Sequence, residues 1–137
     1  MATESRLRRA GFVFVELYVE EPARYVPLFR DALGFTVLRD EGTFVELGSE
    51  RGLVLLNAFD DADEGHPFEH YRSHRRRGMG VEIGIVVEPE RLSASWERSR
   101  ALEGFEVTAI VEQEWGMTDY RVVTPHGYYL RITTPPR

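Results

Sequence analysis

The feature that most constrains the fold of this sequence is a pattern of elements that occurs twice, a strand followed by a helix and then by three strands. In the first half, residues 12–19 are strongly β-prone, and Pro22 suits the first turn of a helix that Gly34 ends. Pro27 lies inside this helix, where it should loosen or kink the first turn. Three further strands are predicted at residues 35–38, 43–47 and 53–58.

The second half repeats this order. A strand is predicted at residues 81–87, and a helix begins at Pro89 and ends at Gly104, with Leu92, Trp96, Ser99 and Leu102 on one face. Three strands follow, at residues 105–111, 120–123 and 128–133, the last two joined by a turn at 124–127. Two such modules predict an α+β fold, and together they can surround one groove of ligand size.

Composition excludes several classes of protein. The chain has 137 residues, 17 basic against 23 acidic, and its net charge of −6 is spread along the sequence, which argues against a nucleic-acid partner and suits a cationic or neutral small molecule. The absence of cysteine excludes disulfides, thiolate metal sites and cysteine nucleophiles. The polar residues 1–9 are not followed by a long apolar stretch, so we expect no signal peptide, no membrane partner and a cytoplasmic protein.

Residues 60–79 separate the modules. They are acidic at the start and carry Arg75, Arg76 and Arg77 at the end, a charge pattern typical of a solvated linker with a short helix. An alternative is a lid or arm that contacts the ligand or a second subunit through Phe59, Phe68 and Tyr71.

The order of elements and several short motifs resemble the vicinal oxygen chelate superfamily, which includes glyoxalase I, extradiol dioxygenases and bleomycin-resistance proteins. The motifs are Leu33-Gly34-Phe35 after the first helix, and later Trp115-Gly116, Asp119-Tyr120 and Pro125-His126-Gly127-Tyr128. The resemblance covers residues 12–134. It implies a single domain over residues 1–137, commonly a homodimer, in which module one (12–59), the linker (60–79) and module two (80–134) form a curved mixed sheet around a cleft.

The resemblance also implies where a metal would be bound in metal-dependent relatives. The four ligand positions fall on Phe14, Leu55, Glu82 and Arg131, and only Glu82 offers a donor that a divalent metal ion accepts. We therefore expect no metal and no cofactor. His66, His70 and His74 are spaced for one helix face, but Gly65 and Pro67 favour a solvated linker over a metal site there, and His126 suits a turn.

The side chains at the predicted ligand positions indicate an aromatic, mostly apolar binding site with a few polar anchors. Such a site suits a flat or extended organic molecule. The predicted ligand-binding residues are Phe14, Glu16, Tyr18, Leu55, Phe59, Glu82, Trp115, Tyr120, Tyr129 and Arg131. Alternatively the aromatic side chains fill the core, and for Tyr18 and Tyr129 both interpretations stay open. For the charged residues Glu16, Glu82 and Arg131, three interpretations stay open. A glutamate and the arginine form a buried ion pair with each other, they orient a ligand, or one glutamate is a general base. We assign no catalytic residue.

We consider three hypotheses for the function, each from a different class of protein. The first is metal-independent sequestration of a small aromatic or amphipathic molecule, in the manner of antibiotic self-resistance against a toxic natural product; here Trp115→Ala should weaken binding. The second is a lyase, isomerase or dioxygenase-type enzyme that uses Glu16 or Glu82 as base, or a metal site that the sequence does not reveal. The third is a dimerising accessory module with a vestigial cleft. We take sequestration as the leading hypothesis.

Overall fold

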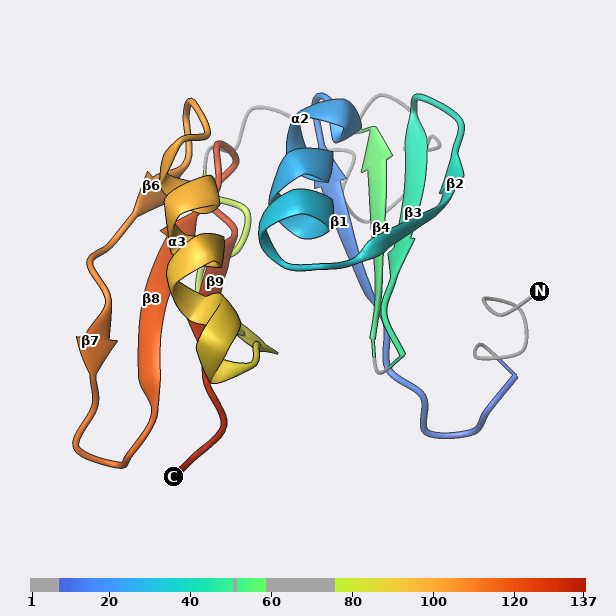
Figure 1. The fold of residues 1–137 in the computed structure, drawn as a ribbon. Helices are drawn as coiled ribbons and strands as arrows, with labels where there is room; N and C mark the ends of the chain where they lie inside the picture. The colour runs from blue at the N-terminus through green and yellow to red at the C-terminus, as the bar shows by residue number, and fades with distance from the viewer. Residues whose placement is uncertain (1–7, 51, 59–75) are drawn as a thin grey trace. The chain divides into compact units, whose positions relative to one another are not determined.

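The computed structural model describes residues 8–50, 52–58 and 76–137, and these residues form two compact units. Unit one spans Met1–Glu69 and unit two spans His70–Arg137. Each unit is a mixed sheet with a helix against one face (Figure 1). Unit one follows the predicted β-α-β-β-β order, and unit two follows it with one strand more after the helix. The predicted α+β class is therefore confirmed. None of the helices in the described ranges is long and apolar enough to cross a membrane.

The sheet of unit one has the strand order β1-β4-β3-β2. Its strands are β1 (Val15–Val19), β2 (Thr36–Asp40), β3 (Phe44–Gly48) and β4 (Leu53–Ala58). The first and last strands, β1 and β4, are parallel neighbours, while β4, β3 and β2 are successively antiparallel. The strand β1 therefore begins later than the strand predicted at residues 12–19, whereas β4 has the predicted bounds.

The helix of unit one changes its winding at Pro27, because proline has no N–H to donate to the carbonyl one turn earlier. The α-helix α2 (Pro22–Val26) continues as the π-helix η1 (Pro27–Ala32), and the N–H of Leu33 donates to the carbonyl of Leu28 at 3.0 Å. Gly34 then takes a φ of 80°, a conformation that suits glycine, and the N–H of Phe35 donates to Phe29 O at 2.8 Å. The helix therefore ends where the sequence predicted.

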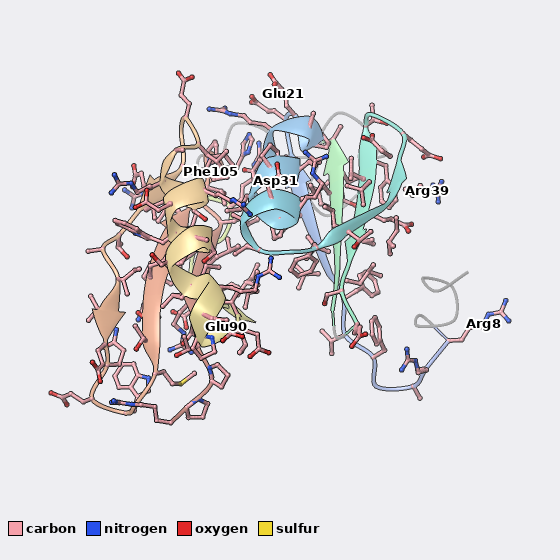
Figure 2. The ribbon with its side chains drawn as sticks, viewed as in Figure 1. Arg8, Glu21, Asp31, Arg39, Glu90 and Phe105 are labelled. Atoms are coloured by element: carbon pink, nitrogen blue, oxygen red, sulfur yellow. The ribbon has the colours of Figure 1, made fainter. Side chains whose placement is uncertain are left out.

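The core of unit one lies between this helix and one face of the sheet. The sheet contributes Leu17, Val19, Val45, Leu47 and Leu56, and the helix contributes Tyr25, Leu28 and Phe29, all buried. The rings of Phe29 and Phe35 meet edge to face, with centroids 5.8 Å apart. Exposed charges such as Asp31 on η1 and Arg39 on β2 carry the labels in Figure 2. Burying each large aliphatic side chain contributes about 1.5–3 kcal/mol to stability.

Unit two repeats this topology with the strand order β5-β9-β8-β6, and β7 also pairs with β8. Its strands are β5 (Ile83–Val86), β6 (Glu106–Val107), β7 (Val111–Glu112), β8 (Thr118–Val123) and β9 (Tyr129–Thr133). A single 3-10 turn, η4 (Pro89–Arg91), leads into the helix α3 (Leu92–Arg100). As in unit one, the first and last strands, β5 and β9, are parallel neighbours.

The strand predicted at residues 105–111 is wrong in one respect, because the structure divides it into β6 and β7. Val107 pairs with Val122 and Val111 pairs with Asp119, so three residues on this side oppose two on β8, which is a β-bulge. The bulge is held at Thr108, whose N–H donates to Arg121 O at 3.0 Å and whose Oγ1 accepts the N–H of Arg121 at 2.8 Å. The indole N–H of Trp96 donates to Thr108 O at 2.9 Å, which ties α3 to the same point.

The position of Tyr120 also differs from the prediction, which counted it among the ligand-binding residues. Tyr120 pairs with Ile132 on the face of the sheet that α3 covers, and its side chain is 0% exposed. Its hydroxyl donates to Ser95 Oγ at 3.0 Å and lies 3.1 Å from Ser99 Oγ. Burial raises the pKa of the Tyr120 phenol above its ordinary value. Tyr120 therefore fastens α3 to the sheet from within the core.

We expect Tyr120→Phe to lower the free energy of unfolding by about 1–3 kcal/mol, because the two serine hydroxyls lose a buried partner. Urea denaturation followed by circular dichroism measures this change. Ser93→Ala, at an exposed position of the same helix, is the control and should change stability by less than about 0.5 kcal/mol. A Tyr120→Phe variant as stable as the parent would show that the hydroxyl cluster contributes nothing to folding.

Candidate ligand-binding site

The strand register of unit two brings two arginines together on the sheet face opposite α3, which we call the arginine face. Arg131 on β9 pairs directly with Arg121 on β8 and, on its other side, with Gly84 on β5. Their neighbours in the strands, Tyr120 and Leu130, point to the other face and are fully buried. Side chains alternate across a strand, so both guanidinium groups project from the arginine face.

A single carboxylate holds this arginine pair. Glu82 Oε1 lies 3.2 Å from Arg131 Nε, and its Oε2 accepts a hydrogen bond of 3.4 Å from Arg121 Nη1. Like charges directly opposite each other on two strands repel. Glu82 relieves that repulsion by placing one oxygen toward each guanidinium.

Arg121 also connects this cluster to an aromatic ring and to a buried acid. Its Nη1 donates to the hydroxyl of Tyr129, and its guanidinium lies 5.9 Å from the centre of that ring. Asp119, 2% exposed, lies 3.5 Å from Arg121 Nε and accepts a 3.0 Å hydrogen bond from Gln113. The hydrogen bond to Tyr129, with a smaller contribution from Asp119, raises the pKa of Arg121 above its ordinary value, so this cation stays charged.

A pocket of about 670 Å³ opens beside this cluster, within unit two. Its walls come from the segment leading into β5, from the end of β8 and the turn after it, and from β6. The lining residues are Arg76, Gly78, Met79, Gly80, Val81, Glu82, Glu106, Val123, Thr124, Pro125, Gly127 and Tyr129. Glu82 and Tyr129 therefore belong both to the arginine cluster and to the wall of the pocket.

One wall of the pocket is fixed by a close approach of two backbone segments. The N–H of Arg77 donates to the carbonyl of His126 at 2.9 Å. Beside it, a Cβ added to Gly78 would lie 2.8 Å from Tyr128 Cα and 3.0 Å from Gly127 O. These are backbone atoms that cannot swing away, so only glycine fits at this crossing.

The predicted site residues of unit one share a face of their own sheet. Glu16 pairs with Leu55 on the face opposite α2, and the hydroxyl of Tyr18 donates to Glu16 Oε1 at 3.3 Å. Tyr18 and Leu55 are buried, while Phe14, just before β1, is 45% exposed.

Two other predicted residues do not join the pocket described above. Trp115 lies in the turn between β7 and β8, is 56% exposed and does not line the pocket. Phe59 lies outside the described residues, as do Phe68, Tyr71 and the histidines at 66, 70 and 74.

Arg121 and the pocket wall at Gly78 were not predicted from the sequence. A signal for Arg121 was present, because the predicted hairpin of 120–123 and 128–133 already sets it opposite Arg131. No comparable signal marks Gly78, since its role depends on contact with a turn distant in sequence.

The donor groups on these strands do not fit a catalytic divalent metal. In the described part of the chain no group of three or more His, Cys, Asp or Glu side chains could hold a metal ion. Unit one pairs Glu16 with Leu55, and unit two pairs Gly84 with Arg131. Glu82 faces two guanidiniums, and an arginine cannot serve as a ligand of such a metal.

Known structures with a similar fold cover nearly the whole chain. A glyoxalase/bleomycin resistance protein/dioxygenase family enzyme from Burkholderia phytofirmans PsJN superposes with a TM-score of 0.71 at 16% identity, over 88% of this chain and 95% of that one. The fosfomycin resistance protein FosX from Listeria monocytogenes gives 0.66 at 12% identity, over 93% and 94%. TioX from Micromonospora sp. ML1 gives 0.60 at 18% identity, over 91% and 96%.

The fold of this chain is therefore that of the glyoxalase/bleomycin resistance/dioxygenase proteins, as the resemblance in sequence implied. At identities this low the likeness defines the fold and leaves the activity open. No protein-family model and no curated protein sequence matches the chain.

We expect Gly78→Ala to destabilise the protein by about 1–3 kcal/mol, because the new methyl group forces the two backbone segments apart. Thermal and urea denaturation measure this effect. Gly84→Ala is the matched control, since a Cβ there meets nothing within 4 Å and the strand favours a side chain. Equal stability of Gly78→Ala and Gly84→Ala would show that the crossing is not rigid.

Proposed function

We propose that this protein binds a small aromatic or amphipathic molecule in the pocket of unit two and sequesters it without a metal ion. The observation that carries the proposal is the pocket itself, with Tyr129 as an aromatic wall and Glu82 held in place by two arginines. We further propose that the molecule is a toxic natural product, so that binding protects the cell that makes or meets it.

The size and lining of the pocket suit such a ligand. A volume of about 670 Å³ lies within the range of sites for drug-sized molecules. Met79, Val81, Val123, Pro125 and Tyr129 offer apolar contact, while Arg76, Glu82 and Glu106 offer a few polar groups. This mixture of apolar area and few polar anchors favours tight binding of one organic molecule in one orientation.

The arrangement of the polar groups favours binding over chemistry. Each oxygen of Glu82 faces a guanidinium, so this carboxylate holds the arginines in place and is not directed at a substrate proton. Thr124, the hydroxyl residue in the lining, accepts the N–H of Tyr128 at 3.0 Å and so supports the turn. Neither group is arranged as a nucleophile with its base.

The similar structures give a biological context for the proposal. One of them is named as a fosfomycin resistance protein, and others as glyoxalase/bleomycin resistance proteins. By analogy of fold, we propose a resistance role for this chain, in a cytoplasmic homodimer.

The pocket can be tested with the neutral fluorescent probe N-phenyl-1-naphthylamine and a panel of aromatic antibiotics that includes bleomycin, by fluorescence and titration calorimetry. We expect Tyr129→Ala to weaken binding about tenfold, because an aromatic contact is lost, and Tyr129→Phe to bind that probe nearly as the parent does. Trp115→Ala is the control. In contrast to the expectation from the sequence, this variant should bind unchanged, because Trp115 is outside the pocket lining.

Three outcomes would contradict this proposal. Absence of saturable binding by every compound would remove the pocket as a binding site. Binding that disappears after dialysis against EDTA would contradict metal independence. Conversion of a bound compound, detected by mass spectrometry, would replace sequestration with the lyase or isomerase alternative.

A further inference from the structure

We infer that the ligand of this pocket presents an uncharged hydrogen-bond acceptor, such as a carbonyl oxygen, to the hydroxyl of Tyr129. The inference rests on the proposed function and names the chemical class of the ligand. It follows from the hydrogen bonding of Tyr129, from the place of its hydroxyl in the wall of the pocket, and from the balance of charge around the pocket.

The hydroxyl of Tyr129 carries a hydrogen that the chain does not use. Its oxygen accepts an N–H of Arg121, and because a guanidinium can only donate, the direction of this hydrogen bond is fixed. Within residues 8–50, 52–58 and 76–137, the phenol hydrogen itself has no acceptor. A phenol that accepts from a cation is polarised, which strengthens it as a donor. Tyr129 is thus a prepared donor, and the acceptor has to come from outside the chain.

This hydroxyl lies where two lining residues of the pocket meet. The nitrogen that donates to Tyr129, Arg121 Nη1, also donates to Glu82 Oε2 at 3.4 Å. Tyr129 and Glu82 both line the pocket, whereas Arg121 does not. Arg121 is therefore a positioning residue, because it orients the phenol without taking a place in the lining itself.

The strand register places an apolar surface beside the donor. Val123 on β8 pairs with Tyr129 on one side and with Glu106 on the other, and all three residues line the pocket. Paired residues share a face of the sheet, and neighbouring strands are about 4.8 Å apart, so the three side chains form one row. A flat ligand can pack on Val123 and on the ring of Tyr129, with one directed hydrogen bond from the hydroxyl of that ring.

The charges around the pocket are already balanced. The two arginines of the arginine face are offset by Glu82 and Asp119. The other two charged residues of the lining, Arg76 and Glu106, have opposite signs. A charged ligand group would lose its hydration here without a counter-ion that is left over for it, whereas a carbonyl oxygen needs only one donor. The balance therefore favours an uncharged acceptor.

The test compares two uncharged fluorescent probes that differ in one carbonyl group. The ketone 6-propionyl-2-(dimethylamino)naphthalene carries an oxygen acceptor that 2-(dimethylamino)naphthalene lacks, and its emission moves to the red when the ketone accepts a hydrogen bond. We expect Tyr129→Phe to weaken binding of the ketone about threefold to tenfold, as loss of one uncharged hydrogen bond predicts, and to move its bound emission to the blue. The probe without the carbonyl should bind Tyr129→Phe as it binds the parent, which also shows that the pocket of the variant is intact.

A matched variant and a charged probe serve as controls. Tyr128→Phe removes a phenol hydroxyl from the neighbouring residue, which does not line the pocket, and should leave both uncharged probes unaffected. The carboxylate 6-(dimethylamino)naphthalene-2-carboxylate places an anion where the ketone has its carbonyl. The parent protein should bind this anion more weakly than the ketone.

The results separate this inference from the proposed function. Unchanged affinity and emission of the ketone in Tyr129→Phe would overturn the hydrogen bond and leave the pocket standing. Equal losses of both uncharged probes in Tyr129→Phe, or equal losses of the ketone in Tyr128→Phe and Tyr129→Phe, would overturn it as well. Tighter binding of the carboxylate than of the ketone would overturn the uncharged acceptor. Failure of every probe to bind the parent protein would overturn the inference and the proposed function together.

Discussion

The cross-strand register of β8 and β9 is the constraint on which both the core and the candidate site of unit two depend. One set of alternate residues, which includes Tyr120 and Leu130, is buried beneath α3, and the other set, which includes Arg121 and Arg131, lies on the opposite face. A slip of one residue in either strand would move a charged arginine into the core and a core residue out of it. The hydrogen bonds from Tyr120 to Ser95 and Ser99 resist that slip, because they fix the strand to the helix at one point. The geometry of the arginine face is thus a consequence of packing on the other side of the sheet.

Holding two guanidiniums side by side is unfavourable unless the surrounding groups compensate for their repulsion. Glu82 contacts both cations, and Asp119 and the hydroxyl of Tyr129 contact Arg121. These groups are only partly exposed, so solvent screens them less than it would screen a surface pair. A rigid and partly desolvated cluster of this kind contributes little to stability. It serves the pocket instead, in our proposal, because it fixes Glu82 and Tyr129, which both belong to the lining.

Most of the fold could be predicted from the sequence, because the elements are marked locally. Pro22 and Pro89 mark helix starts, Gly34 marks a helix end, and runs of β-prone residues mark β1, β4, β8 and β9. The bulge at residues 108–110 was missed because nothing in that segment distinguishes a continuous strand from an interrupted one. Of the predicted site residues, Glu82 and Arg131 contact each other and Tyr129 lines the pocket, whereas Tyr120 belongs to the core. The face of the sheet on which Tyr120 lies depends on the strand register alone, and a tyrosine is equally suited to a core and to a ligand site.

The order of strands in the two sheets has a consequence for how the chain folds during its synthesis. In each unit the last strand lies between the first strand and the strand that precedes it in the chain, so β4 separates β1 from β3 and β9 separates β5 from β8. During synthesis, β5 emerges long before β9, its hydrogen-bonding neighbour, and α3 emerges before the hydroxyl of Tyr120 that holds it. The sheet of unit two therefore cannot close until its final strand has left the ribosome, whereas unit one can close as soon as β4 has emerged. Unit one is in this sense the part of the protein that can fold first, and the pocket is the part that is completed last.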